Sequence, residues 1–150
     1  PQISKASAKT SSSSFKFPRP MLNTNCYDFS FSGLKTHVTQ SVKKNILTDE
    51  LISNIAFDFE NAILDVLISK TLRAATDLNV DNIVISGGVS ANKRLRERFE
   101  NEKRNKNIFF PDIAFSTDNG AMIAYMGYLK YHKDIKSSLE INPNPSSRLV

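Results

Sequence analysis

Residues 82–92 read NIVISGGVSAN. The first five residues form a short, mostly apolar run, which is typical of a parallel strand that is covered on both faces. The two glycines that follow predict a turn, and a helical pattern then runs from Ala91 to about Asn105. A second apolar run, residues 108–110, predicts a second strand. Strand, turn, helix and strand together predict a right-handed βαβ crossover, so we expect the α/β class.

The glycine turn is also the first candidate site. Gly87 and Gly88 carry no Cβ, so the backbone there can approach a ligand closely. A helix that begins after such a turn offers free N–H groups to an anion, and ligands of open α/β sheets lie beyond the carboxyl ends of the strands. Asn92 can both donate and accept hydrogen bonds, as a ribose or a base requires. The same residues are equally explained by a tight turn that uses its glycines for geometry alone.

Three more helices are expected from capping residues and periodicity. The first runs from Ser32 to about Lys44. The second begins after Thr48 as N-cap and extends to about Asp77, with apolar residues at helical spacing that predict a core face. The last covers residues 119–131, and its predicted apolar side consists of Met122, Ile123, Met126 and Leu129.

The loop that precedes the last helix is the second candidate site. Asp118 lies at the junction, where it serves either as an N-cap or as a hard oxygen ligand for a metal. One carboxylate cannot hold a metal alone. His37 and His132 are isolated in the sequence, so we expect structural roles for both, and no H-E-x-x-H pattern supports a zinc peptidase.

A third unusual stretch is DFSFSGLKT, residues 28–36. Ser32 is expected to cap the helix that follows it. Lys35 then falls in the first helical turn, where the helix dipole disfavours a cation. A lysine in that position suits an anionic partner, although a solvated side chain explains it as well.

Composition limits the remaining classes. The chain has 150 residues, 40 % of them hydrophobic, which suits one soluble domain with a modest core. No apolar run approaches the ~18 residues of a membrane span, and nothing resembles a signal peptide. The single cysteine, Cys26, excludes an internal disulfide and suits a reducing cytosol. The net charge of +5 favours polyanionic partners, although the basic stretch 93–104 is interleaved with acids, as on a solvated helix face.

The chain divides into three expected parts. Residues 1–16 are interpreted as a loop or as a remnant of structure whose partner is absent. Residues 17–135 form the ordered body, and residues 136–150 are expected to be a flexible tail because prolines and serines dominate the end.

Four segments together resemble one family. They are FPRPM at 17–21, the stretch 28–36, GGVSAN at 87–92 with Leu95 and Arg96 after it, and TDNGAMIA at 117–124. In this order and at about this spacing they resemble the TsaD family, the tRNA threonylcarbamoyladenosine synthases, over residues 1 to about 135. The resemblance implies the actin-like, Hsp70-like ATPase (ASKHA) fold, with this chain as an incomplete C-terminal lobe. It also implies transfer of a threonylcarbamoyl group from threonylcarbamoyl-AMP to N6 of adenosine 37 in tRNAs that read codons starting with A.

The resemblance further assigns residues and partners. It implies that Asn92 contacts the adenylate, that Gly87 and Gly88 line its pocket, and that Asp118 ligates one divalent metal, iron or zinc. The family's His-x-x-x-His pair is not in this sequence, so we expect weak metal binding and no catalysis by this chain alone. The expected partners are tRNA and, in bacteria, a TsaB-like paralogue and a TsaE-like ATPase, with no membrane and a cytoplasmic or organellar location. With tRNA as substrate, the basic residues Lys35, Arg94 and Arg96 are candidate tRNA contacts.

Two other classes stay open at this point. One is a non-catalytic scaffold that binds the family's partner proteins. The other is a basic RNA-binding piece that uses Lys93, Arg94, Arg96, Arg98, Lys103 and Arg104.

Overall fold

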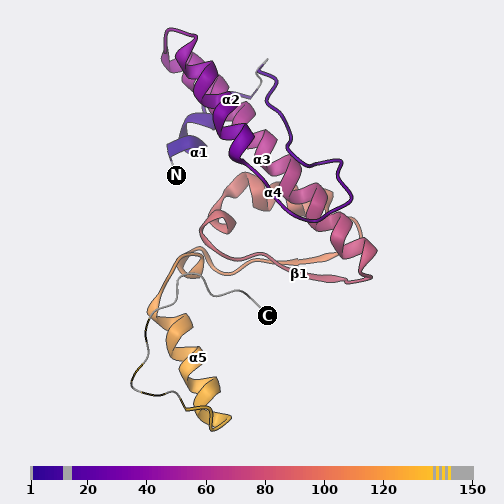
Figure 1. The fold of residues 1–150 in the computed structure, drawn as a ribbon, viewed down its shortest axis with the longest axis vertical. Coiled ribbons are helices and arrows are strands. Elements are labelled where there is room, and N and C mark those ends of the chain that lie inside the picture. Colours follow the sequence, from indigo (N-terminus) through magenta and orange to yellow (C-terminus); the bar gives the residue numbers. More distant parts are fainter. Residues whose placement is uncertain (1, 12–14, 137, 139, 141, 143–150) are drawn as a thin grey trace.

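The structure is a computed structural model, and it describes residues 2–11, 15–136, 138, 140 and 142 (Figure 1). None of the helices within these ranges is long and apolar enough to cross a membrane. The predicted flexible tail, 136–150, lies largely outside the described residues. The elements in chain order are α1 (Gln2–Ser7), α2 (Ser32–Lys43), α3 (Asp49–Asp77), β1 (Asn82–Val84), the 3₁₀ helix η1 (Gly88–Ala91), α4 (Lys93–Glu102), β2 (Asn107–Phe109), the 3₁₀ helix η2 (Ile113–Phe115) and α5 (Gly120–His132).

Helix α3 is the long element against which most others pack. Its start follows the predicted capping chemistry, because the Thr48 side chain accepts a hydrogen bond from the Leu51 N–H at 3.2 Å. The apolar face of α3 is divided between two core clusters. The first half of the helix packs with α2 and the segment around Phe17, and the second half packs with α4 and the sheet. The predicted core helix is therefore confirmed.

The two strands form a parallel pair, as predicted, with Ile83 opposite Ile108. The expectation that the first strand is covered on both faces is wrong. Ile85 and Ile108 pack into the cluster formed with α3 and α4, whereas Val84 is 73 % exposed and Phe109 is 51 % exposed. Alternate residues of a strand point to opposite faces, so one face of this sheet is packed and the other is open within the described part of the chain.

The N-terminal residues contain a helix where a loop or remnant was expected. Helix α1 packs beside α3, and its last residue, Ser7, is buried. The Ser7 hydroxyl donates to Glu60 of α3 at 2.6 Å, which anchors α1 to the middle of the long helix. The partner of this segment is therefore α3 itself.

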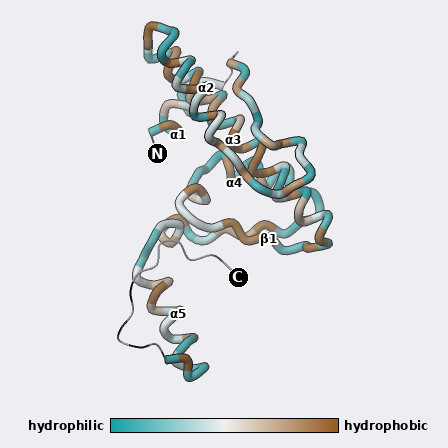
Figure 2. Tube along the Cα trace, in the orientation of Figure 1, coloured by the Kyte–Doolittle hydropathy of each residue, from teal (hydrophilic) through white to brown (hydrophobic). Residues whose placement is uncertain are grey.

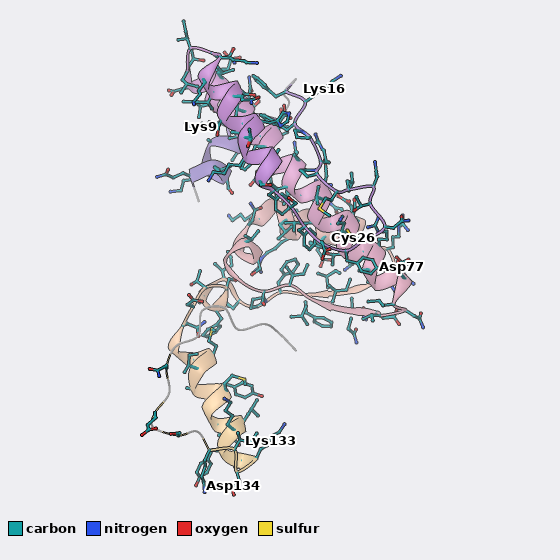
Figure 3. All side chains as sticks on the ribbon, in the orientation of Figure 1. Lys9, Lys16, Cys26, Asp77, Lys133 and Asp134 are labelled. Atoms are coloured by element: carbon teal, nitrogen blue, oxygen red, sulfur yellow. The ribbon has the colours of Figure 1, made fainter. Side chains whose placement is uncertain are left out.

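The loop between residues 22 and 28 runs along the second half of α3, where Figure 3 marks Cys26. The buried Lys70 ammonium donates to the carbonyls of Cys26 and Asp28, at 3.1 and 2.6 Å. Arg73, one turn further along α3, donates to the carbonyls of Thr24 and Cys26 at 2.8 and 2.9 Å. Two cations of α3 thus satisfy the backbone of a loop that has no regular partner strand.

Helix α5 projects away from the other elements (Figure 1), and apolar residues lie along its length (Figure 2). Its bounds agree with the prediction to within one residue. None of its residues is buried, and Met122, Ile123 and Met126 are each about half exposed or more. The predicted apolar side of this helix therefore has no packing partner in the described part of the chain.

Candidate functional site

The glycine turn joins the end of β1 to η1, and its two glycines have different reasons to be there. Gly87 has φ 87° and ψ 170°, a conformation that only glycine adopts without strain. Gly88 has no such constraint, and a Cβ built on it would meet only the Thr117 methyl group, at 4.0 Å. The turn therefore requires Gly87 for its backbone angle, whereas packing does not require Gly88. The same contact places Gly88 beside the loop that carries Asp118.

The helix after the turn begins later than predicted. Residues 88–91 form a single turn of 3₁₀ helix, and α4 starts at Lys93 with Asn92 as its N-cap. The Asn92 Oδ1 accepts from the Leu95 N–H at 2.9 Å. One free N–H of α4 is therefore already occupied by a side chain of the chain itself.

The Asn92 amide is also held by α3 and α1. Its Nδ2 donates to Glu60 Oε1 at 2.7 Å and to Ser4 Oγ at 3.1 Å. Both amide hydrogens are used in these bonds, so the side chain has only acceptor capacity left on Oδ1. In this arrangement Asn92 cannot donate to a ligand without giving up one of its bonds to Glu60 or Ser4.

Glu60 is the centre of this polar cluster, and it was not singled out by sequence reasoning. The side chain is buried on α3, where burial raises the pKa of the carboxyl, but hydrogen bonds from Ser7, Asn92, Ser4 and Arg94 outweigh burial and hold that pKa below its ordinary value. Arg94 donates to Glu60 Oε2 at 3.1 Å. The sequence did contain a signal for Glu60, because it is a charged residue within the apolar stripe of a predicted helix.

Arg94 and Arg96, two predicted tRNA contacts, are both engaged inside the fold. Besides Glu60, the Arg94 guanidinium donates to Asn61 at 2.6 Å and lies over the Phe57 ring at 4.4 Å. Arg96 donates to the carbonyls of Ser90 and Pro111 at 2.7 and 2.8 Å. Both guanidinium groups are therefore partly committed to hydrogen bonds within the fold. A structural role explains both side chains.

Asp118 lies in the short loop between η2 and α5. It is exposed, and its carboxylate makes no hydrogen bond or ion pair with the residues that the structure describes. The N-cap explanation for Asp118 is wrong, because Asn119 takes that position and accepts from the Met122 N–H at 3.0 Å. The Asp118 carboxylate is therefore available to an external group.

The family can be assigned with this geometry in view. The family model described as TsaD, tRNA N6-adenosine threonylcarbamoyltransferase, matches residues 1–125. The chain belongs to the TsaD family. Curated relatives named tRNA N6-adenosine threonylcarbamoyltransferase include those of Thermosipho africanus, 45 % identical over 148 residues, and Sulfurihydrogenibium sp., 43 % identical over 145 residues. These matches cover 96 % and 95 % of this chain but only 45 % and 42 % of the relatives. The chain thus spans less than half the length of these relatives.

TsaD membership implies a metal, so the chain's own donor groups decide whether it can hold one. Within the described ranges, no group of three or more His, Cys, Asp or Glu side chains is arranged to hold a metal ion. His37 Nδ1 lies 3.0 Å from the Gly33 carbonyl of its own helix, and His132 packs edge-on against Tyr128 at 4.3 Å. Asp118 therefore offers at most one ligand, and the described residues do not complete a metal site.

Three other residues that stand out in the sequence have a defined place in the structure: Lys35, Ser32 and Cys26. Lys35 is exposed in the first turn of α2, as predicted, and it lines an apolar hollow of about 290 Å³ together with residues of α1, α2 and α3. Ser32 does not cap α2, since Phe31 occupies the N-cap position and makes no side-chain cap. The Cys26 thiol lies 3.3 Å from Thr24 Oγ1, and this hydrogen bond lowers the pKa of the thiol. Of the three predicted tRNA contacts, Lys35 alone has a cation with no hydrogen bond or ion pair to the described residues.

Proposed function

We propose that this chain is the C-terminal part of a tRNA threonylcarbamoyladenosine synthase. The complete enzyme would transfer the threonylcarbamoyl group of threonylcarbamoyl-AMP to N6 of adenosine 37 in tRNAs that read codons starting with A. The observation that carries the proposal is the adjacency of two motifs far apart in sequence. Gly88 lies beside Thr117, so the glycine turn and the loop of Asp118 are neighbours at the carboxyl ends of the two strands, and we place the nucleotide space between them.

Each side of this space has a distinct proposed role. At the turn, the absence of a Cβ on Gly88 lets the backbone approach the adenylate, since a Cβ there would meet only the Thr117 methyl group, at 4.0 Å. Asn92 contributes its remaining acceptor capacity to the adenosine, because its N–H groups are bound to Glu60 and Ser4. On the other side, the free carboxylate of Asp118 is the candidate ligand for a divalent metal, iron or zinc, in the complete protein. The lobe would belong to the actin-like, Hsp70-like (ASKHA) architecture.

The proposed partners follow from the family. They are tRNA and, in bacteria, a TsaB-like paralogue and a TsaE-like ATPase, in the cytoplasm or in an organelle. Lys35 is the candidate tRNA contact that we retain, because its cation is exposed, whereas Arg94 and Arg96 are bound within the fold.

A titration of ligand tests the proposal. A stable threonylcarbamoyl-adenylate analogue is titrated by calorimetry into this chain, alone and mixed with the N-terminal half of the Thermosipho africanus relative. We expect heat of binding in the mixture only, and we expect Gly88→Ala to abolish it because a methyl group occupies the approach. Gly127→Ala, a glycine of the exposed α5 with nothing within 4 Å of its added Cβ, is the matched control and should bind like the parent. No heat from a mixture shown to be folded and associated would contradict the proposal.

One observation favours a second candidate function, a scaffold without catalysis. The open face of the sheet, with Val84 and Phe109, is exposed, and so are apolar residues of α5. Exposed apolar residues that gather on one face are typical of protein contacts. Tight binding of a TsaB-like partner by a chain that binds no adenylate analogue in any mixture would favour the scaffold.

A further inference from the structure

We propose that Arg96 is a positioning residue that ties the glycine turn to the loop of Asp118 and so sets the spacing of the two sides of the nucleotide space. The inference rests on the proposed function, because it concerns the same space. It assigns Arg96 a role that does not depend on contact with tRNA.

The contacts of Arg96 reach both segments from one side chain. Its Nε donates to the Ser90 carbonyl at 2.7 Å, within the turn that follows β1. One terminal nitrogen donates to the Pro111 carbonyl at 2.8 Å and lies 3.4 Å from Ser116 Oγ, in the loop that follows β2. The guanidinium also lies over the Phe110 ring, 4.8 Å from its centre.

Two of the acceptor residues of Arg96 are buried. Ser90 is 0 % exposed and Ser116 is 2 % exposed, whereas Arg96 and Pro111 are half-buried, so water competes only in part for these bonds. Ser116 is also held by its own hydroxyl, which donates to the Asp112 carbonyl at 3.2 Å. The next residues along the chain are Thr117, which neighbours Gly88, and Asp118. Fixing Ser116 therefore fixes the start of the loop that presents the Asp118 carboxylate.

Only an arginine fits this arrangement of acceptors. The planar guanidinium presents several donors in fixed directions and stacks on a ring, whereas a lysine ammonium reaches such separated carbonyls poorly and does not stack in the same way. The hydrogen bonds of Arg96 go to neutral carbonyl and hydroxyl oxygens, and no ion pair of Arg96 occurs within the described part of the chain. Arg96 therefore holds the two segments by hydrogen bonds whose directions are set by the planar guanidinium, and not by an ion pair.

Nothing else joins the two segments by hydrogen bonding. Over the described residues, no direct hydrogen bond links 86–92 to 111–119, so the bonds of Arg96 supply the connection beyond the paired strands. Removal of the Arg96 hydrogen bonds should therefore increase the mobility of both segments, while the rest of α4 remains packed on α3.

Hydrogen exchange of the 150-residue chain tests the connection. We expect Arg96→Lys to raise amide exchange in residues 86–92 and in 111–119 by about tenfold or more. Arg98→Lys is the matched control on the same helix, because Arg98 binds Asp65 and Glu102 and contacts neither segment. Ser116→Ala is a milder second variant that removes one acceptor, and it should raise exchange in 111–119 only.

A second readout links the connection to the ligand. In the mixture with the N-terminal half of the Thermosipho africanus relative, Arg96→Lys should weaken binding of the adenylate analogue by about tenfold, whereas Arg98→Lys should leave it unchanged. Unchanged exchange in 111–119 for Arg96→Lys, or an equal rise for Arg98→Lys, overturns the proposal. Exchange that changes as expected in a chain whose parent mixture binds no analogue supports the connection and refutes the proposed function instead.

Discussion

At the scale of single residues, the site combines groups that the fold requires with groups that it does not. Gly87 and Asn92 are required, the first by its backbone angle and the second as a helix cap bound to Glu60. Gly88 and Asp118 make no contact that the fold needs. Residues of the second kind are the ones that a ligand explains better than packing does, and they allow function and stability to be tested separately.

The two glycines should respond differently to the same substitution. Gly87→Ala is expected to lower the free energy of unfolding by about 1–3 kcal/mol, because alanine must adopt a conformation reserved for glycine. Gly88→Ala should change it by no more than about 0.5 kcal/mol, since its Cβ meets only an ordinary contact. Urea unfolding of both variants measures the difference. Equal losses would show that the turn does not have this geometry.

Glu60 should make the stability of the chain depend on pH. The pKa of its carboxyl is lowered in the folded state, from an ordinary value of 4.5, so its contribution is fully present above about that pH and is lost as the pH falls through the lower folded value. We expect the urea midpoint of the parent to fall in this acidic range more steeply than that of Glu60→Gln. At neutral pH the same variant should be less stable by about 1–3 kcal/mol, because the bonds of Ser7, Asn92 and Arg94 lose a charged acceptor. Parallel pH profiles of parent and variant would contradict the assignment.

At the scale of elements, the helices could be predicted because their signals are local. Thr48 is an N-cap followed by an acidic first turn and an apolar stripe, and α3 begins and ends where these signals indicate. The bonds of Glu60 could not be predicted in the same way, since Ser7 and Arg94 lie 53 and 34 residues away from it in sequence. The helix in residues 2–7 was missed because its stability comes from packing on α3 and not from its own six residues.

The cap of α3 offers a direct test at this scale. Thr48→Ala should cost about 1 kcal/mol of unfolding free energy, because the Leu51 N–H loses its side-chain acceptor. Thr36→Ala is the matched control, since Thr36 is exposed within α2 and bonds only the carbonyl of Ser32 in its own helix. Thermal unfolding followed by circular dichroism compares the two. If Thr36→Ala lowered the free energy of unfolding by as much as Thr48→Ala, the stabilisation could not be attributed to the cap.

At the scale of the whole molecule, two apolar segments that were expected to be covered are exposed in the structure. The apolar run of β1 predicted cover on both faces, yet Val84 lies on an open face, and the apolar helix α5 has no buried residue. Apolar patterning reports the environment of a residue in the complete protein. This chain spans 45 % of the Thermosipho africanus relative, so such patterns predict contacts that the described residues do not themselves supply.

The candidate site was likewise only partly predictable from the sequence. The sequence identified the glycine turn and the Asp118 loop, and the structure places Gly88 beside Thr117. It could not show that Arg96 joins them, because the acceptors are mainly backbone carbonyls, which every residue carries. Nor could the sequence complete a metal site from Asp118 alone. We therefore propose that this chain supplies the glycine turn and the Asp118 carboxylate, and that the rest of the complete protein supplies the other metal ligands.

Formation of threonylcarbamoyladenosine in tRNA tests the central claim most directly. The chain is combined with the N-terminal half of the Thermosipho africanus relative, the expected bacterial partner proteins, iron or zinc, and unmodified tRNA, and the modified nucleoside is quantified by mass spectrometry. The account predicts product from the combination and none from either half alone. With Asp118→Ala it predicts a loss of about 100-fold or more, because mutation of even an outer-shell partner of a metal ligand typically costs about 10–100-fold. Asp49→Ala is the control and should keep the parent activity. Product that forms equally well with Asp118→Ala, or no product from halves shown to associate, would contradict it.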